Sequence, residues 1–353
     1  MAGYYSFTGD YYDNDNYTFD INSLLPTNTP VQETLTTPYE WAALGIFSLV
    51  FVIGVPGNGL VVWMTAFEMK RTVNTVWFLN LAVADLLCCF VVPFSIMEII
   101  LQKKWLLGLF ACKTLPSVLL VNMYASVLLL TLISIDRCAL VVKPVWCQNK
   151  RTVHKAYVAC GVVWIFAFVL TSPSFIFRQT ILRNSTTKCI MDYTYLGEHQ
   201  QKVENFIAIF RFLMGFVIPF FVITITYSVL VSKVRGRFTE SSKTLKVVLV
   251  VITAFFICWF PYHVAGLILA AHNIKSGLYA SVLVVDPLLI AIAFINSCVN
   301  PIIYVLMGQD FKSKFRKSIK AVLRNVLAEE TSRTFDSKNT KFTTDTKNSE
   351  TPI

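Results

Sequence analysis

Seven long stretches of apolar residues, with almost no charge inside them, dominate the chain. They fall at 41–67, 75–101, 114–135, 156–177, 212–232, 247–274 and 279–309. Each is long enough to cross the hydrocarbon core of a bilayer as a helix, which takes about 20 residues. A helix satisfies its own backbone hydrogen bonds in lipid, and the alternating segments typical of a β-barrel do not occur. The pattern therefore predicts an all-α membrane protein, a bundle of seven transmembrane helices.

The distribution of basic residues gives the predicted bundle a direction. Of all residues 55% are hydrophobic and only 15% are charged, and no Lys or Arg occurs before Lys70. The connecting segments 68–71, 137–155, 233–246 and 310–327 hold 18 Lys and Arg, whereas those on the opposite side hold nine. Because basic residues accumulate on the cytoplasmic side, we expect a multi-pass plasma-membrane protein with an extracellular N-terminus and a cytoplasmic C-terminus. The net charge of +10 reflects this bias and does not indicate nucleic-acid binding.

The sequence divides into four predicted parts, which are the extracellular tail 1–40, the transmembrane domain 41–308, the segment 309–327 and the C-terminal tail 328–353. In 309–327 apolar residues recur at helical spacing among Lys and Arg. This pattern predicts an amphipathic eighth helix on the cytoplasmic face of the membrane. The C-terminal tail is rich in Ser and Thr, which favours phosphorylation. Its candidate sites are Ser332, Thr334, Ser337, Thr340, Thr343 and Thr344.

The N-terminal tail is acidic and rich in tyrosine. Residues 1–40 contain six Asp and Glu and no Lys or Arg. Few aliphatic residues occur before residue 21, which predicts disorder. An acidic arm attracts a cationic partner over a Debye length of about 10 Å. Tyr11 and Tyr12, flanked by Asp10 and Asp13, are the candidates for sulfation, and the alternative is a tail that only improves solubility.

Two sequons and one pair of cysteines are expected on the extracellular side. Asn16 and Asn184 each begin an Asn-X-Ser/Thr sequon there, which indicates N-glycosylation. Of the nine cysteines only Cys112 and Cys189 lie outside, at the top of the third helix and in the second outer loop. In an oxidising compartment they are natural disulfide partners. Their bond would hold that loop across the mouth of the bundle.

A carboxylate in the middle of the second apolar run needs a cation, a proton or hydrogen-bond donors, because charge is costly at that depth. This residue is Asp85, and the polar side chains at comparable depth include Asn122, Ser126, Asn296 and Asn300. Their oxygens suit a structural sodium ion. A hydrogen-bonded network between helices explains them equally well, and both interpretations stay open. No other cofactor is expected.

Arg137 stands between Asp136 and Cys138 at the end of the third run, where a charge is a functional candidate. It belongs to a series of landmarks along the chain, which are Gly57-Asn58, Asp85, Cys112, Asp136-Arg137-Cys138, Trp164, Cys189, Pro219 with Tyr227, Cys258-Trp259-Phe260-Pro261, and Asn300-Pro301 with Tyr304. In this order they resemble the rhodopsin-like G-protein-coupled receptors over about residues 40–327. Cys138 departs from the tyrosine that is commoner in that class.

Within this class the chain resembles the anaphylatoxin receptors of the chemoattractant branch. The similar stretches are Trp77–Asp85, Asn122–Ser126, Lys143–Asn149, Thr244–Val248 and Leu323–Leu327. The resemblance implies a receptor for complement fragment 5a, a basic plasma protein fragment that ends in arginine. It further implies chemotactic and inflammatory signalling through an inhibitory-class G protein, with receptor kinases and arrestin acting at the tail.

The resemblance also implies where the ligand binds. By matched position Arg178 and Arg211 would meet the ligand's terminal carboxylate and Asp286 its terminal guanidinium, through charge-assisted hydrogen bonds. The remaining implied ligand contacts are Glu204, Tyr262 and Met123. The alternative is that Arg211 and Asp286 pair only with each other.

Activation is implied to be a population shift between two helix arrangements. Ligand contacts would bias the region around Trp259, and Arg137, held inactive by Asp136 and its surroundings, would be released to the G protein. The residues implied in this step are Asp136, Arg137, Tyr227, Phe255, Trp259, Pro261, Asn300, Pro301 and Tyr304.

Other functions fit the sequence less well. A related non-signalling decoy lacks the arginine that corresponds to Arg137 and has an altered seventh-helix motif, and both are intact here. Chemokine receptors usually carry an extra disulfide between the N-terminal tail and the third outer loop, and residues 1–87 and 259–297 contain no cysteine to form it. An opsin would need a lysine in the seventh helix to bind retinal, and residues 276–311 contain none. A formyl-peptide receptor or another chemoattractant receptor stays open as an alternative. A transporter would show symmetric halves, and an enzyme would need a catalytic group such as a Ser–His pair in the membrane, so neither is expected.

Overall fold

The computed structural model describes residues 37–183, 186–234, 241–272 and 276–307. The chain forms two units, up to Ile303 and from Tyr304 onward, and the first holds nearly all of the described residues. Several predicted features lie outside the described residues and stay predictions. They are Asp10, Tyr11, Tyr12, Asp13, Asn16, Asn184, the helix 309–327, the side chain of Tyr304 and the phosphorylation candidates of the tail.

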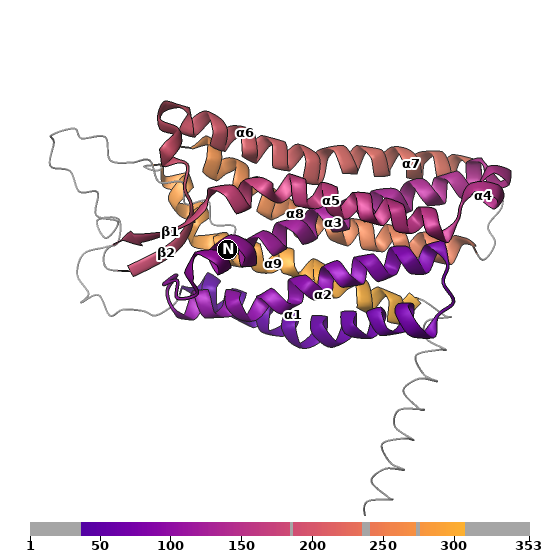
Figure 1. The fold of residues 1–353 in the computed structure, drawn as a ribbon, viewed down its shortest axis with the longest axis horizontal. Helices are drawn as coiled ribbons and strands as arrows, with labels where there is room; N and C mark the ends of the chain where they lie inside the picture. The colour runs from indigo at the N-terminus through magenta and orange to yellow at the C-terminus, as the bar shows by residue number, and fades with distance from the viewer. Residues whose placement is uncertain (1–36, 184–185, 235–240, 273–275, 308–353) are drawn as a thin grey trace, which may run out of the picture. The chain divides into compact units, whose positions relative to one another are not determined.

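Long helices make up most of the described chain (Figure 1). They are α1 (Pro38–Trp63), α2 (Val73–Ile100), α3 (Gly108–Val142), α4 (Pro144–Lys150), α5 (Val153–Phe177), α6 (Gln200–Phe212), α7 (Ile218–Val234), α8 (Ser241–Ala271) and α9 (Gly277–Met307). Three short turns of 3₁₀ or π type join or extend them, η2 (Met64–Glu68), η3 (Thr194–His199) and η4 (Leu213–Val217). Seven helical segments are long and apolar enough to cross a membrane, which confirms the predicted seven-helix membrane fold.

Two of the helices begin where the sequence supplies a capping box. Thr37 accepts a hydrogen bond from the backbone N–H of Glu40 at 3.2 Å, and the Glu40 carboxylate accepts one from Thr37 N–H at 2.8 Å. Thr72 and Thr75 form the same reciprocal pair at the start of α2. Such a box satisfies backbone donors that have no partner inside the helix, so the chain starts each helix at a defined residue.

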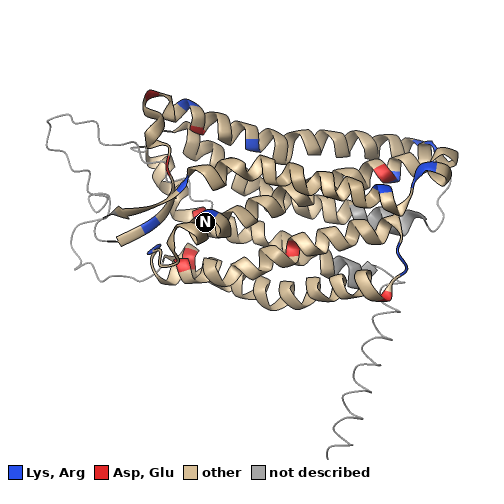
Figure 2. Ribbon diagram, viewed as in Figure 1, with Lys and Arg blue, Asp and Glu red and all other residues tan. Residues whose placement is uncertain are grey.

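The third helix is the centre of the bundle. In α3, 72% of the most apolar membrane window is buried, a larger share than in any of the other six spans. It contacts α2, α5, α7 and α8, whereas α1 packs mainly on α2. Polar side chains also join the helices, since Trp164 Nε1 of α5 donates to Asn80 Oδ1 of α2 at 3.0 Å. Figure 2 shows most of the charged residues towards the two ends of the helices.

The fifth membrane segment begins earlier than the sequence predicted. The apolar run was placed at 212–232, but the helical segment runs from Thr194 to Lys233 through η3, α6, η4 and α7. Its first part is amphipathic, with Glu204 and Arg211 on the buried side, so the apolar run alone does not mark its start. Both residues therefore lie on a helix and not in an outer loop.

A two-stranded hairpin covers one end of the bundle, opposite the end that carries α4 (Figure 1). Strand β1 (Arg178–Arg183) pairs antiparallel with β2 (Thr186–Met191), and Thr180 lies opposite Cys189 in the register. Cys189 forms a disulfide bond with Cys112 at the start of α3, with 5.6 Å between their Cα atoms. This confirms the predicted bond, which fixes the hairpin to the top of the central helix.

Candidate ligand-binding site and conformational switch

Four charged side chains from the hairpin and from two helices are buried beneath the end of the bundle that the hairpin covers. They are Arg178 at the start of β1, Glu204 and Arg211 on α6, and Asp286 on α9, and each is less than 10% exposed. Burying ionised groups is costly unless opposite charges or donors compensate. The concentration of both signs in one place is therefore a feature that the fold maintains, as expected for a site that recognises a charged ligand.

Arg178 is the most enclosed of these charges and is only 2% exposed. Its Nε donates to Ser174 Oγ at 3.2 Å, one turn back along the chain at the end of α5. Burial away from water lowers the pKa of its guanidinium, and the negative charges of Glu98 and Asp286 oppose that shift. The side chain is thus held in place by the protein before any ligand arrives.

Arg178, Glu204 and Arg211 line one pocket of about 180 Å³. The pocket opens among α3, α5 and α6, and its wall includes Tyr193 directly after the hairpin. The structure therefore brings together three of the six predicted ligand contacts. Tyr262, Asp286 and Met123 are buried but lie outside this pocket's lining.

A row of aromatic side chains leads from the buried charges into the bundle. The Arg211 guanidinium lies over the ring of Tyr262, with its carbon 5.6 Å from the ring centroid. Tyr262 packs edge-to-face on Trp259 at 5.5 Å between centroids, and Trp259 lies 6.0 Å from Phe255. All three rings are fully buried on α8. A displacement of Arg211 or Tyr262 would have to repack this row, because protein interiors leave no free volume.

Met123 lies deeper, where α3 faces the π-helical turn η4. A Cβ built on Gly215 would come within 3.0 Å of the Met123 methyl carbon and 3.3 Å of the His263 ring. Gly215 thus permits the close approach of these two helices beside the aromatic row. His263 itself was not predicted to matter, since a single buried histidine has no recognisable spacing.

Asp85 is fully buried at the centre of a polar network that joins α2, α3 and α9. Its Oδ2 accepts a hydrogen bond from Asn300 Nδ2 at 2.6 Å. In the orientation that satisfies both of its amide atoms, Asn122 donates to Asp85 Oδ1 and to Ser126 Oγ, at 3.2 and 3.3 Å. Asn300 Oδ1 is buried without a hydrogen-bond partner among the described residues, as is Asn296 Nδ2. The hydrogen-bonded network between helices, one of the two alternatives, is present. The unpaired Asn300 Oδ1 is an oxygen ligand of the kind that hard cations prefer.

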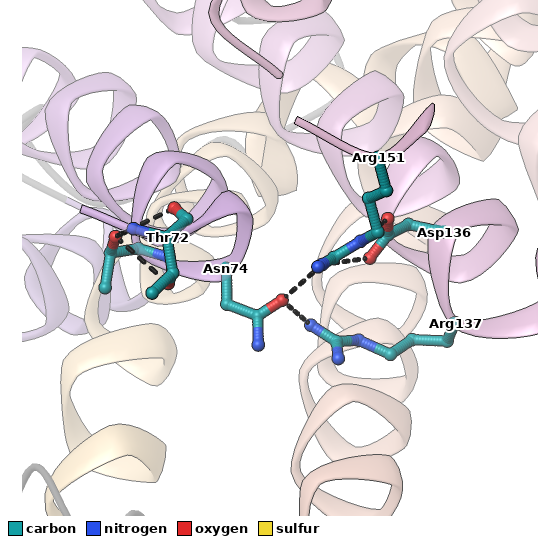
Figure 3. Close-up of polar contacts among 6 residues, drawn as sticks. Thr72, Asn74, Asp136, Arg137 and Arg151 are labelled. Carbon is teal, nitrogen blue, oxygen red and sulfur yellow. Dashed lines mark hydrogen bonds and ion pairs between the residues drawn. The ribbon is translucent and has the colours of Figure 1, made fainter. Parts of the chain in front are cut away.

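At the other end of the bundle Arg137 and Asp136 do not hold each other (Figure 3). Asp136 accepts two hydrogen bonds from Arg151, at 2.6 Å from Nε and 2.9 Å from Nη2. Arg137 instead donates to Asn74 Oδ1 at 2.6 Å, and Arg151 donates to the same oxygen at 2.7 Å. Asp136 therefore makes no direct hydrogen bond to Arg137 in this arrangement, and among the described residues Asn74 is the side chain that bonds Arg137. Arg151 follows α4 and competes for the carboxylate with two well-aligned donors.

The remaining predicted switch residues lie on α7, α8 and α9. Tyr227 points a buried hydroxyl inward without a hydrogen-bond partner in the described chain. Pro261 lies within α8, and Pro301 of α9 packs against α1, where a Cβ on Gly57 would come within 3.1 Å of its ring. Asn74 and Arg151 are the functional candidates that sequence reasoning missed. Neither belongs to a motif. Arg137 and Arg151 follow Asn74 in the chain by 63 and 77 positions, and only the fold brings both guanidinium groups to the Asn74 side-chain oxygen.

Comparison with known proteins identifies the family. Residues 57–304 match the family model described as 7 transmembrane receptor (rhodopsin family). The chain belongs to the rhodopsin family of seven-transmembrane receptors. The receptor is thus a multi-pass membrane protein, and the matched range contains the landmarks from Gly57 to Tyr304.

Named relatives of this receptor are similar over most of its length. It is 47% identical to the C5a anaphylatoxin chemotactic receptor 1 of Oryctolagus cuniculus over 324 residues, which is 90% of this chain and 91% of the relative. It is 45% identical to the protein of the same name from Homo sapiens over 329 residues, 90% and 93% of the two chains. The C3a anaphylatoxin chemotactic receptor of Oncorhynchus mykiss is 42% identical over 310 residues, 85% and 84% of the two chains.

Proposed function

We propose that this rhodopsin-family receptor binds C5a, the basic complement fragment 5a, and converts that binding into activation of an inhibitory-class G protein, chemotaxis and inflammatory signalling. The names of its most similar relatives support C5a as the ligand, and a relative named for C3a makes that fragment the rival. A ligand that ends in arginine presents a carboxylate and a guanidinium close together. The receptor needs groups of both signs to receive it.

The observation that carries this proposal is the set of buried charges under the hairpin. Arg178 and Arg211 offer guanidinium groups to the ligand's terminal carboxylate, and Asp286 offers a carboxylate to the ligand's terminal guanidinium. Arg–carboxylate pairs form planar, charge-assisted hydrogen bonds that gain strength away from water. The disulfide between Cys112 and Cys189 keeps the hairpin beside this site, so the ligand would enter between the hairpin and the helices.

Signal transfer follows from the aromatic row on α8. When the ligand draws Arg211 away from the face of Tyr262, the contacts from Tyr262 to Trp259 and Phe255 repack and shift the preferred position of α8. A ligand shifts such an equilibrium only as far as its affinities for the two arrangements differ. At the far end, Arg137 leaves Asn74 and becomes available to the G protein.

The orientation that goes with this function places the N-terminus outside the plasma membrane and the C-terminus in the cytoplasm. The excess of Lys and Arg in the connections on one side supports it. The acidic, tyrosine-rich tail then meets the basic ligand first, and the Ser/Thr-rich tail meets receptor kinases and arrestin.

A sodium ion at Asp85 would stabilise the resting arrangement. The fit rests on the buried Asn300 Oδ1, which has no hydrogen-bond partner among the described residues and lies in the side chain that bonds Asp85. Asp85, Ser126 and Asn300 would hold the ion, with Asn122 and Asn296 at the border of the site. The ion would supply a positive charge for a carboxylate that lies in a low-dielectric interior.

The test of the proposed function is activation in a defined system. The receptor is reconstituted in nanodiscs with an inhibitory-class heterotrimer, and nucleotide exchange is measured with C5a, C3a and a formyl peptide. Exchange at the lowest concentrations of C5a supports the proposal. Exchange driven by C3a or the formyl peptide but not by C5a would assign another chemoattractant, and C5a binding without exchange would indicate a decoy.

A further inference from the structure

The turn that follows α2 lies at the hairpin end of the bundle and carries two charges that are not among the proposed ligand contacts. Glu98 lies in the last turn of α2, Lys103 lies three residues beyond its end, and both side chains are half-buried. The chain folds back between them, because Lys103 N–H donates to Glu98 O at 2.8 Å. One short piece of chain therefore presents a carboxylate and an ammonium group together.

This turn is strained and is held in place by the hairpin. Gln102 and Lys103 both have left-handed backbone conformations, with φ angles of 51° and 62°, which are unfavourable for residues other than glycine. Directly after them, Trp105 N–H donates to Thr187 O of β2 at 2.7 Å, and the Trp105 ring is buried against the two disulfide-bonded cysteines. A strained conformation persists only where the surrounding structure enforces it, and such conformations concentrate at functional sites. The turn is thus a fixed part of the mouth, which keeps Lys103 half-buried while the next residue, Lys104, is exposed.

The two charges of this turn act on two of the buried charges of the ligand site. Arg178 and Asp286 are only 2% and 6% exposed, so each needs an opposite charge nearby. Among the charged side chains that act on Arg178, Glu98 acts most strongly, ahead of Asp286. Lys103 acts on Asp286 more strongly than Arg178 does. Without a ligand, the turn after α2 therefore compensates both buried charges.

A ligand that ends in arginine brings the same two charges to the same two residues. Its carboxylate would meet Arg178, on which Glu98 already acts with a negative charge, and its guanidinium would meet Asp286, on which Lys103 already acts with a positive charge. Like charges at one position repel, so Glu98 and Lys103 have to move aside. A guanidinium can form two planar hydrogen bonds with a carboxylate whereas an ammonium group is a flexible point charge, which favours the ligand in this exchange. The displaced side chains can then neutralise each other, because they belong to one turn.

We propose that Glu98 and Lys103 are internal counterions that stand in for the ligand's terminal carboxylate and guanidinium in the empty receptor, and that the ligand must displace both to bind. This inference rests on the proposed function, in which Arg178 and Asp286 receive a terminal arginine. It makes Glu98 and Lys103 determinants of ligand specificity. A ligand that carries only one of the two terminal charges displaces only one counterion and gains less.

The test measures equilibrium binding of three forms of C5a to the intact receptor in nanodiscs. One form ends in arginine, one ends in citrulline and lacks the terminal positive charge, and one ends in argininamide and lacks the terminal carboxylate. Lys103→Gln should bind the arginine and argininamide forms about fivefold more tightly than the unchanged receptor does, and the citrulline form equally. Glu98→Gln should bind the arginine and citrulline forms about fivefold more tightly, and the argininamide form equally.

Lys104→Gln is the matched control, because it removes the same charge from the neighbouring, exposed side chain. It should leave all three affinities unchanged, and Lys103→Arg, which keeps the charge, should gain no affinity. Equal gains in Lys103→Gln and Lys104→Gln would show that these lysines only repel a basic ligand at a distance, and would overturn the proposal. An equal gain of Lys103→Gln for the citrulline and arginine forms would overturn it as well.

A second measurement needs no ligand. Thermal unfolding of the purified receptor is compared for Lys103→Gln, for Asp286→Asn and for the variant with both changes, as a double-mutant cycle. Lys103→Gln should lower the unfolding temperature by about 2 °C where Asp286 is present and have no effect in the Asp286→Asn background. Equal effects in both backgrounds would show that Lys103 does not compensate Asp286. If the unchanged receptor fails to bind C5a, the proposed function fails, and this cycle still decides whether the internal counterion exists.

Discussion

Replacing Asn74 with alanine should raise the basal activity of the receptor about tenfold. Asn74 Oδ1 accepts hydrogen bonds from both Arg137 and Arg151, at 2.6 and 2.7 Å. Arg151 keeps its two bonds to Asp136 when Asn74 is truncated, so the connection after α4 stays attached to α3. Arg137 loses the side-chain partner that holds it in this arrangement.

A hydrogen bond to a charged group contributes about 1.5–3 kcal/mol, and the partial exposure of this pair favours the lower value. A loss of about 1.5 kcal/mol in the resting arrangement corresponds to a roughly tenfold shift towards the alternative. The assay is nucleotide exchange on a purified G protein in nanodiscs without ligand, at matched receptor amounts.

Asn80→Ala is the matched control, since it makes the same change on the same helix and breaks a bond to Trp164 instead. It should lower thermal stability and leave basal exchange unchanged. Basal exchange that is unchanged or lower in Asn74→Ala would refute the role given to the Arg137–Asn74 bond.

Three further predictions address packing, the hairpin and the ion. Gly54→Ala should lower the free energy of unfolding by about 1–3 kcal/mol, because the added methyl group would overlap Cys89 Sγ. Gly59→Ala adds its methyl group to open space and should leave stability unchanged. Thermal unfolding of the solubilised receptor measures both variants. Cys112→Ser should release the hairpin and weaken C5a binding at least tenfold, measured by equilibrium binding at equal surface expression, and unchanged binding would show that the tether is dispensable. Asp85→Asn should abolish any effect of sodium, compared with choline, on agonist affinity, and a persisting sodium effect would remove the ion from this site.

The helices and the disulfide could be predicted because each follows from local chemistry. Seven apolar runs require seven spans, and Cys112 and Cys189 were the two cysteines on the expected outer side. The start of the fifth segment could not be predicted in this way. Its first helix, α6, turns a polar face with Glu204 and Arg211 into the bundle, so a search for apolar residues passes over it.

The sequence predicted which residues belong to the candidate site and the switch, but it did not predict which of them form hydrogen bonds with one another. The resemblance to a receptor family supplied Arg178, Arg211 and Asp286, and the structure buries all three beneath the hairpin. The resemblance gave no reason to pair Asp136 with Arg151. These two residues are 15 positions apart in the chain, and they meet only because the connection between α3 and α5 turns back. Sequence neighbours such as Asp136 and Arg137 point to different sides of a helix, so adjacency in the chain was a poor guide to contact.

The central claim is that the buried charges recognise the terminal arginine of C5a, and the most direct test compares two ligands on two receptors. Equilibrium affinities are measured for intact C5a and for C5a without its terminal arginine, on the unchanged receptor and on Asp286→Asn. The account predicts a preference for the intact ligand that falls by roughly 30-fold in the variant, which corresponds to the loss of about 2 kcal/mol from one charge-assisted pair. A variant that weakens both ligands equally, and so keeps the preference, would contradict it.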